Sequence, residues 1–192
     1  MSSEPSRSSR VERLALADLV TVVLDEVTPH DVVIVDGRSG AGKSTFAREL
    51  RRRWPSDASV ELIALDDVYP GWDGLAAGAS YAVARVLAPR VAGEPARWQQ
   101  WDWAADRYVG ERTLAASSAV ILEGSGALTA TAARFAAVRV WLDAPAELRK
   151  RRALDRDGET YRPHWERWAA QEDEHIRRDD PRSLATHLAE LV

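Results

Sequence analysis

The stretch Asp31–Ser44, which reads DVVIVDGRSGAGKS, decides the fold. It opens with Asp31–Asp36, a run of β-branched apolar residues between two aspartates, and such a run is typical of a strand buried on both faces. The glycine-rich part follows without a break, and Lys43–Trp54 then predicts a helix that is stopped by Pro55. The sequence therefore predicts a strand, a glycine-rich loop and a helix in direct succession.

The glycine-rich loop matches the pattern G-x-x-x-x-G-K-[ST] at every fixed position. Glycines let backbone N–H groups approach phosphate oxygens without a Cβ in the way, and the N-terminus of the next helix adds free donors. In this pattern Lys43 reaches the β- and γ-phosphates, and the hydroxyl of Ser44 ligates Mg²⁺. We therefore predict that ATP and Mg²⁺ are the cofactors and that ATP contacts Gly37, Ser39, Gly40, Ala41, Gly42, Lys43, Ser44 and Thr45.

Three further apolar segments predict strands: Val60–Leu65, Val120–Leu122 and Val138–Leu142. Helical patterns separate them, and each strand is too apolar to face water. Strands that alternate with helices in this way form a parallel sheet covered by helices on both faces. We expect an α/β P-loop NTPase fold with a five-stranded parallel sheet and an arginine-rich lid over about residues 150–176.

The two ends of the chain are less regular. Residues 1–10 are polar and rich in serine, and we interpret them as a disordered leader before a single domain over residues 11–192. Val11–Val27 has the apolar spacing of an amphipathic helix, whereas Ser183–Val192 fits either a helix or a strand.

Composition excludes several kinds of protein. The chain has 192 residues and no cysteine, so disulfides and thiolate metal sites are ruled out. Its net charge of −4 argues against a general nucleic-acid partner. There is no apolar stretch long enough to span a bilayer, so we expect no membrane partner and a cytoplasmic location. The four histidines are dispersed and predict no zinc site.

Other motifs separate the possible classes of P-loop protein. The sequence contains no asparagine, so the Asn-Lys-x-Asp motif by which GTPases read guanine cannot be present. The Leu-Ser-Gly-Gly signature of transporter ATPases is missing as well. The third predicted strand ends Ile121-Leu122-Glu123-Gly124, where a motor ATPase normally shows an Asp–Glu pair. These features favour a small-molecule kinase, which works mainly by positioning its two substrates and by neutralising the charge of the phosphates.

From about Val32 to Arg178 the chain resembles the uridine kinase, phosphoribulokinase and bacterial pantothenate kinase group of P-loop kinases. Uridine kinases carry Asp-x-Phe-Tyr after the second strand, Tyr-Asp-Phe before the third, and Glu-Gly at the end of the third. The resemblance rests on these segments in the same order: GRSGAGKST, LDDVY at Leu65–Tyr69, WDW at Trp101–Trp103, VILEG at Val120–Gly124 and RRALDRDG at Arg151–Gly158.

The resemblance implies roles for several side chains. Asp66 matches the catalytic base and would help to organise Mg²⁺, Lys43 would act with it in catalysis, and Asp67 falls at the variable place. Glu123 would serve Mg²⁺ or a substrate hydroxyl, and Tyr69 would line the acceptor pocket. The alternatives are that Asp66 caps a turn, that Glu123 merely ends a strand and that Tyr69 lies on an exposed loop.

The lid and the WDW segment carry two further expectations. By the resemblance, Arg152 and Arg156 cover the transferring phosphate, while the remaining basic residues nearby form a solvated face. Trp101 and Asp102 border the acceptor pocket. The alternative is that the indoles of this segment are buried against the sheet and that Asp102 faces solvent.

The acceptor is less well defined. Uridine kinases have a histidine that reads the pyrimidine, whereas this chain has Asp106, and Val68 stands where they have phenylalanine. We expect phosphoryl transfer from ATP to a hydroxyl of a small metabolite, with a nucleoside-like acceptor favoured and a homo-oligomer left open. The alternatives are a regulatory or non-catalytic nucleotide-binding protein and a zeta-toxin-like kinase of a larger substrate.

Overall fold

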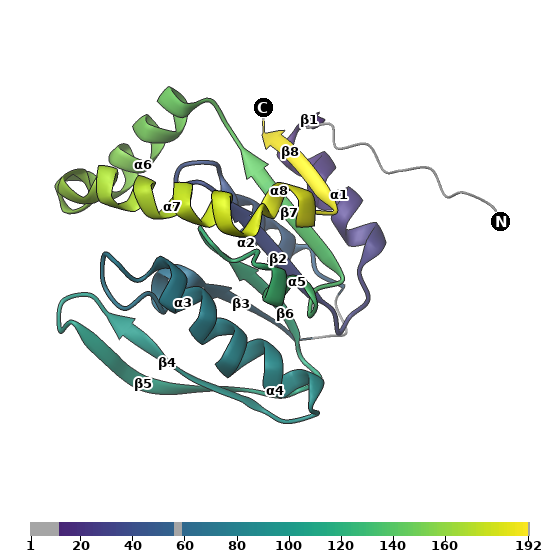
Figure 1. The fold of residues 1–192 in the computed structure, drawn as a ribbon. Helices are drawn as coiled ribbons and strands as arrows, with labels where there is room; N and C mark the ends of the chain where they lie inside the picture. The colour runs from purple at the N-terminus through teal and green to yellow at the C-terminus, as the bar shows by residue number, and fades with distance from the viewer. Residues whose placement is uncertain (1–11, 56–58, 192) are drawn as a thin grey trace.

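The computed structural model describes residues 12–55 and 59–191, and these residues form an α/β fold around a parallel sheet (Figure 1). Six strands of the described chain make up this sheet in the order β1-β8-β7-β2-β6-β3. The strands are β1 Glu12–Leu14, β2 Val32–Gly37, β3 Val60–Ala64, β6 Ala119–Glu123, β7 Val138–Asp143 and β8 His187–Leu191.

The strand predicted from DVVIVD is β2, and it lies inside the sheet between β6 and β7. Every residue of β2 is buried, because helices cover both faces of the sheet. Val33 and Val35 belong to the apolar core on one face, whereas Val32 and Ile34 belong to the core on the other. The continuous β-branched run is therefore explained by burial on two sides.

Helices α1 Leu16–Glu26 and α2 Lys43–Arg52 contribute to the core on the Val33 face. The core on the opposite face contains residues of α3 Leu75–Ala82, α5 Ala130–Ala133, α6 Ala146–Tyr161 and α7 Trp165–Asp179. Shorter elements connect them: η1 Leu65–Asp67, η2 Val83–Leu87, α4 Ala88–Val91, η3 Arg162–His164 and α8 Pro181–Leu184. None of the helices in the described ranges is long and apolar enough to cross a membrane.

The predicted number of strands was wrong, because the sheet has six strands instead of five. Strand β1 precedes α1 within the segment predicted as one helix, Val11–Val27, and Ser183–Val192, which fits either a helix or a strand, contains strand β8. These two short segments pair with each other in parallel, and β8 also pairs with β7. Each is too short to show a clear local pattern, so the pairing between distant segments decides their structure. The leader predicted for residues 1–10 lies outside the described residues.

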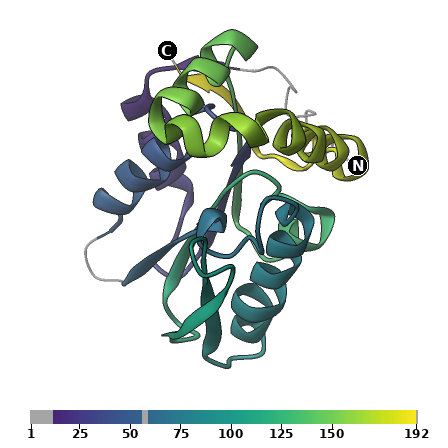
Figure 2. The same cartoon turned by 90° about the vertical axis from the view of Figure 1, so that its left-hand side faces the viewer.

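A second, two-stranded sheet was not predicted. Strands β4 Ala96–Asp102 and β5 Arg107–Leu114 form an antiparallel hairpin. In Figures 1 and 2 this hairpin lies with α3 and α4 at the bottom of the molecule, and the helices α6 and α7 lie at the top.

Gly37 ends β2 where two strands come very close together. It has a φ of 147°, and a Cβ at this position would lie 2.2 Å from the carbonyl oxygen of Leu142 in β7. Backbone atoms of a neighbouring strand cannot move aside without breaking the sheet, so only glycine fits here.

We therefore expect Gly37→Ala to lower the free energy of unfolding by about 3 kcal/mol, because a rigid backbone clash lies at the upper end of single-residue effects. Urea unfolding followed by circular dichroism measures this loss. Gly110→Ala is the control: Gly110 also has a positive φ, of 61°, but a Cβ there meets nothing within 4 Å. Its cost is limited to the backbone conformation, about 1 kcal/mol. Equal losses in the two variants would contradict the close approach at Gly37.

Candidate active site

A cavity of about 740 Å³ lies at the carboxyl ends of the sheet strands, next to the glycine-rich loop. This is the edge at which α/β sheets bind their ligands. The predicted site residues that line the cavity are Ser39, Gly40, Gly42, Lys43, Ser44, Thr45, Asp66, Tyr69, Glu123, Arg152 and Arg156. Segments that are far apart in the sequence thus meet around one space.

Two residues of the predicted nucleotide contact set are not among the residues that line this cavity. Gly37 is closed in by β7, and Ala41 is fully buried in the core below the loop. Both residues support the loop from inside the protein.

Lys43 is held within the loop that precedes it. Its side chain is buried, and its Nζ donates to the carbonyl oxygen of Arg38 at 3.1 Å and to Ser125 Oγ at 3.2 Å. These two contacts fix the ammonium group at the wall of the cavity. A cation that is already positioned stabilises phosphate charge without first having to reorganise.

Two carboxylates face Lys43 from the ends of two neighbouring strands. Asp66 lies in η1, directly after β3, and Glu123 is the last residue of β6. Burial raises the pKa of Glu123, and Lys43 together with a hydrogen bond from Ser44 opposes this rise. Desolvation in the cavity also raises the pKa of Asp66, again against the charge of Lys43.

Asp67 has a different environment from Asp66. Its side chain accepts a hydrogen bond from Gln100 on the β4–β5 hairpin, and it does not line the cavity. Of the two adjacent aspartates, only Asp66 therefore lines the cavity.

The oxygen atoms of Ser44, Asp66 and Glu123 fit a Mg²⁺ site of the kind that phosphate-binding enzymes use. The Ser44 hydroxyl lies in hydrogen-bond contact with Glu123, and both carboxylates are near Lys43. Within residues 12–55 and 59–191, no three His, Cys, Asp or Glu side chains are grouped closely enough to hold a metal alone. Mg²⁺ commonly needs only one or two carboxylates, because phosphates and water complete its octahedral shell.

The arginines of α6 divide into two groups. Arg149 is buried behind the loop, where its Nε donates to the carbonyl oxygen of Ala144 at 3.1 Å. Arg152 and Arg156 instead line the cavity from the lid side. Arg156 makes a two-pronged hydrogen bond with Asp157, at 2.8 and 2.6 Å, and this bond raises its pKa, as do the charges of Asp66 and Glu123.

Aromatic side chains form one wall of the cavity. Trp72 lies between Trp103, at a ring-centre distance of 4.9 Å, and Tyr161, against which it stacks at 5.6 Å. All three rings line the cavity together with Trp168. Trp103 also donates its indole N–H to the backbone oxygen of Asp66 at 2.9 Å, which connects this aromatic wall to the backbone of η1.

The structure does not bring Trp101 and Asp102 to the cavity. Trp101 packs edge-on against Tyr108 at 5.0 Å within the hairpin. Asp102 accepts hydrogen bonds from the backbone N–H groups of Ala104 and Ala105, both at 2.9 Å, and so stabilises the hairpin turn. Trp103 reaches the cavity because it follows the end of β4, where the strand alternation of side chains no longer applies.

Tyr69 lines the cavity but is almost completely buried, and its hydroxyl donates to the backbone oxygen of Ser125 at 2.7 Å. It therefore shapes the floor of the cavity more than it offers a polar group to a ligand. Trp72 was not predicted to line the cavity, and the aromatic spacing at Tyr161 and Trp168 favours packing on the lid turn over contact with a ligand.

Comparison with known proteins supports the fold. No protein-family model and no curated protein matches the chain. A solved structure described as a possible uridine kinase from Bacillus stearothermophilus superposes with a TM-score of 0.64 at 18% identity, covering 90% of this chain and 95% of that one. A protein assigned as a fructose transport system kinase from Silicibacter sp. TM1040 superposes with a TM-score of 0.63 at 17% identity, covering 93% of this chain and 98% of that one. The chain has the α/β fold of these P-loop kinase structures, with the six-stranded sheet described above.

The two cavity-lining arginines generate a prediction about charge. With MgATP in the cavity, Arg156→Ala removes a cation that faces Asp66 and Glu123, and we expect ADP release from MgATP to slow about a hundredfold. Arg152→Ala should slow it as well, and the dissociation constant for MgATP should change by less than about threefold in both variants. Arg151→Ala is the control, because Arg151 lies on the same helix, is exposed and does not line the cavity. An Arg156→Ala protein as active as the control would assign Arg156 to the solvated face.

Proposed function

We propose that this protein is an ATP-dependent phosphotransferase that phosphorylates a hydroxyl group of a small metabolite, and that the acceptor is nucleoside-like. The observation that carries this proposal is the meeting of Lys43, Asp66 and Glu123 around one cavity. A loop that only binds MgATP needs a carboxylate on the Mg²⁺ side, which Glu123 can supply. A kinase needs a further carboxylate such as Asp66, because the acceptor hydroxyl must lose its proton.

The residues suggest how transfer would proceed. The acceptor oxygen attacks the γ-phosphorus of ATP, the bond from that phosphorus to the β,γ-bridging oxygen breaks, and ADP leaves. Asp66 takes the proton from the acceptor hydroxyl, while Lys43 and Arg156 stabilise the charge that develops on the transferring group. Mg²⁺, held by the Ser44 hydroxyl and Glu123, would neutralise phosphate charge.

The aromatic wall supports a planar acceptor. Trp72 and Trp103 line the cavity, and Trp103 is 41% exposed, so its ring can stack on a nucleobase or on the apolar face of a sugar. Trp168 also lines the cavity, but it is only 5% exposed. The contact between Trp103 and the backbone of Asp66 would place such a ring beside the proposed base. The P-loop and this wall line the same cavity, as the donor and the acceptor of one transfer require.

The proposal is tested by measuring ADP release from MgATP across nucleosides, pentoses, pantothenate and related alcohols. We expect at least one nucleoside-like compound to stimulate ADP release strongly, and Lys43→Ala to abolish the stimulation because the loop then lacks its cation. Tight MgATP binding with no stimulation by any acceptor would instead favour a regulatory nucleotide-binding protein.

The two adjacent aspartates provide a sharper test of the catalytic base. With the acceptor found in that screen, Asp66→Asn should lower kcat at least about a hundredfold and change MgATP binding far less, because it removes the proton acceptor and one charge near the Mg²⁺ site. Asp67→Asn is the matched control and should stay within about threefold of wild type, since its side chain faces the hairpin. The reverse order of effects would move the base from Asp66 to Asp67.

A further inference from the structure

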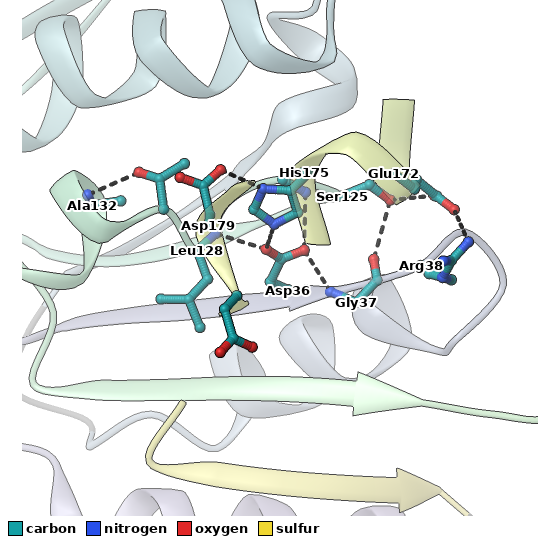
Figure 3. Close-up of polar contacts among 12 residues, drawn as sticks. Asp36, Gly37, Arg38, Ser125, Leu128, Ala132, Glu172, His175 and Asp179 are labelled. Carbon is teal, nitrogen blue, oxygen red and sulfur yellow. Dashed lines mark hydrogen bonds and ion pairs between the residues drawn. The ribbon is translucent and has the colours of Figure 1, made fainter. Parts of the chain in front are cut away.

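Behind the glycine-rich loop lies a buried group of charged residues that phosphoryl transfer does not use directly (Figure 3). His175 of α7 is 2% exposed. Its Nε2 lies 2.8 Å from a carboxylate oxygen of Asp36, and its Nδ1 lies 3.0 Å from a carboxylate oxygen of Asp179. Both ring nitrogens face a carboxylate, so both contacts are hydrogen bonds only when the ring carries two protons.

Asp36 is the next-to-last residue of β2, directly before Gly37, and it is fully buried. Its carboxylate accepts hydrogen bonds from three backbone N–H groups: that of Gly37 at 2.6 Å, that of Gly126 at 2.9 Å and that of Leu128 at 2.8 Å. With His175 as the fourth donor, one carboxylate connects the start of the glycine-rich loop, the loop after β6 and the lid-side helix α7.

A second contact from α7 reaches the same loop. Glu172, one helical turn before His175, accepts a hydrogen bond from the backbone N–H of Ser39 at 2.7 Å. It also lies 2.9 Å from Ser125 Oγ, the atom to which Lys43 donates. The helix α7 thus holds the loop at its start, through Asp36, and at Ser39, and the position of Lys43 depends on the same network.

The charges around His175 favour its protonated form. Burial by itself lowers its pKa, but the hydrogen bonds and charges of Asp36 and Asp179 outweigh burial, so that the pKa lies above its ordinary value. The groups that face it are Asp36 from β2, and Asp179 and Glu172 from α7, with Arg178 bound to the outer side of Asp179. The loop after β6 contributes the Ser125 hydroxyl and the amides that bind Asp36.

We propose that His175 is a positioning residue for nucleotide binding: its doubly protonated ring bridges Asp36 and Asp179, and this bridge holds the glycine-rich loop and Ser125 in the geometry that places Lys43. The inference rests on the proposed function, because it assigns a task to the site that binds MgATP. When the ring loses a proton it keeps a single N–H, one carboxylate then faces a lone pair, and the loop loses one of its anchors.

The proposed bridge makes the affinity for MgATP depend on pH. The bridge is complete below the ordinary pKa of histidine and is lost as the pH rises through the raised pKa of His175 in the folded protein. Affinity for MgATP should therefore fall with rising pH in the wild-type protein, beyond any change that comes from the nucleotide.

The test compares the dissociation constant of the fluorescent nucleotide mant-ATP, with Mg²⁺, between about pH 6 and about pH 9. We expect His175→Gln to weaken binding about tenfold at the acidic end, as the loss of a charged buried hydrogen bond predicts. The ratio of the two dissociation constants should shrink toward one at high pH. The control is His187→Gln: His187 on β8 also lies near a carboxylate, with its Nε2 3.4 Å from Glu26, but it does not contact the loop, so its affinity should match wild type.

Proton NMR of the histidine ring hydrogens gives a second measurement, the titration midpoint of His175. A purely structural role would not link this midpoint to nucleotide binding. The resonance that disappears in His175→Gln should titrate with a raised midpoint. Asp179→Asn should lower both this midpoint and that of the binding curve, because it removes one facing charge and leaves the Asp36 contact in place. If the His175→Gln protein does not fold, the Asp179→Asn protein still tests whether His175 positions the loop.

Three results would overturn the inference. They are unchanged mant-ATP affinity in a folded His175→Gln protein, a neutral His175 ring at the acidic end of the range, and an Asp179→Asn protein with an unshifted binding curve. Failure of the proposed function gives a different result: the wild-type protein would still bind MgATP with the pH dependence described, but no acceptor would stimulate ADP release.

Discussion

The buried carboxylate of Asp36 is the constraint on which the architecture of the site depends. A carboxylate taken out of water costs several kcal/mol unless its oxygens are matched by donors. Here three backbone N–H groups and an imidazole nitrogen surround it. Those donors come from three separate segments, so satisfying the charge forces the segments together. The glycine-rich loop, the loop after β6 and the helix α7 therefore have little freedom to move independently.

The geometry next to Asp36 explains why the loop begins with glycine. Gly37 has to donate its N–H to Asp36 while its Cα passes close to the backbone of β7. Gly40 approaches the lid helix in the same manner, since a Cβ there would lie 2.1 Å from the carbonyl oxygen of Arg149. The glycines thus serve the packing of the protein around the loop as well as the approach of a phosphate.

The sequence predicted the elements whose signal is local. The β-branched run, the loop glycines and Lys43 are adjacent in the chain, and Asp66 and Glu123 follow from the rule that parallel strands end at one edge of the sheet. The sixth strand could not be predicted in this way, because β8 is stabilised by pairing with β1 at the other end of the chain. The environment of His175 could not be predicted from the local sequence either. The stretch Glu172–Asp180 is so rich in charge that it resembles a solvated helix surface, and only the tertiary fold shows that Glu172 and His175 point inward.

The lid helices connect the two sides of the cavity. Tyr161, at the end of α6, donates its hydroxyl to Ser39 Oγ at 3.0 Å and stacks its ring on Trp72. Ser39 is also held through its backbone N–H by Glu172, so the aromatic wall and the glycine-rich loop share one residue as a common anchor. A ligand that moves Trp72 must disturb Tyr161, and through it the loop that positions Lys43. The proposed acceptor side of the cavity and the loop that holds Lys43 are therefore connected by direct contacts, and α6 has a kink at Gly158, with φ 59° and ψ −137°.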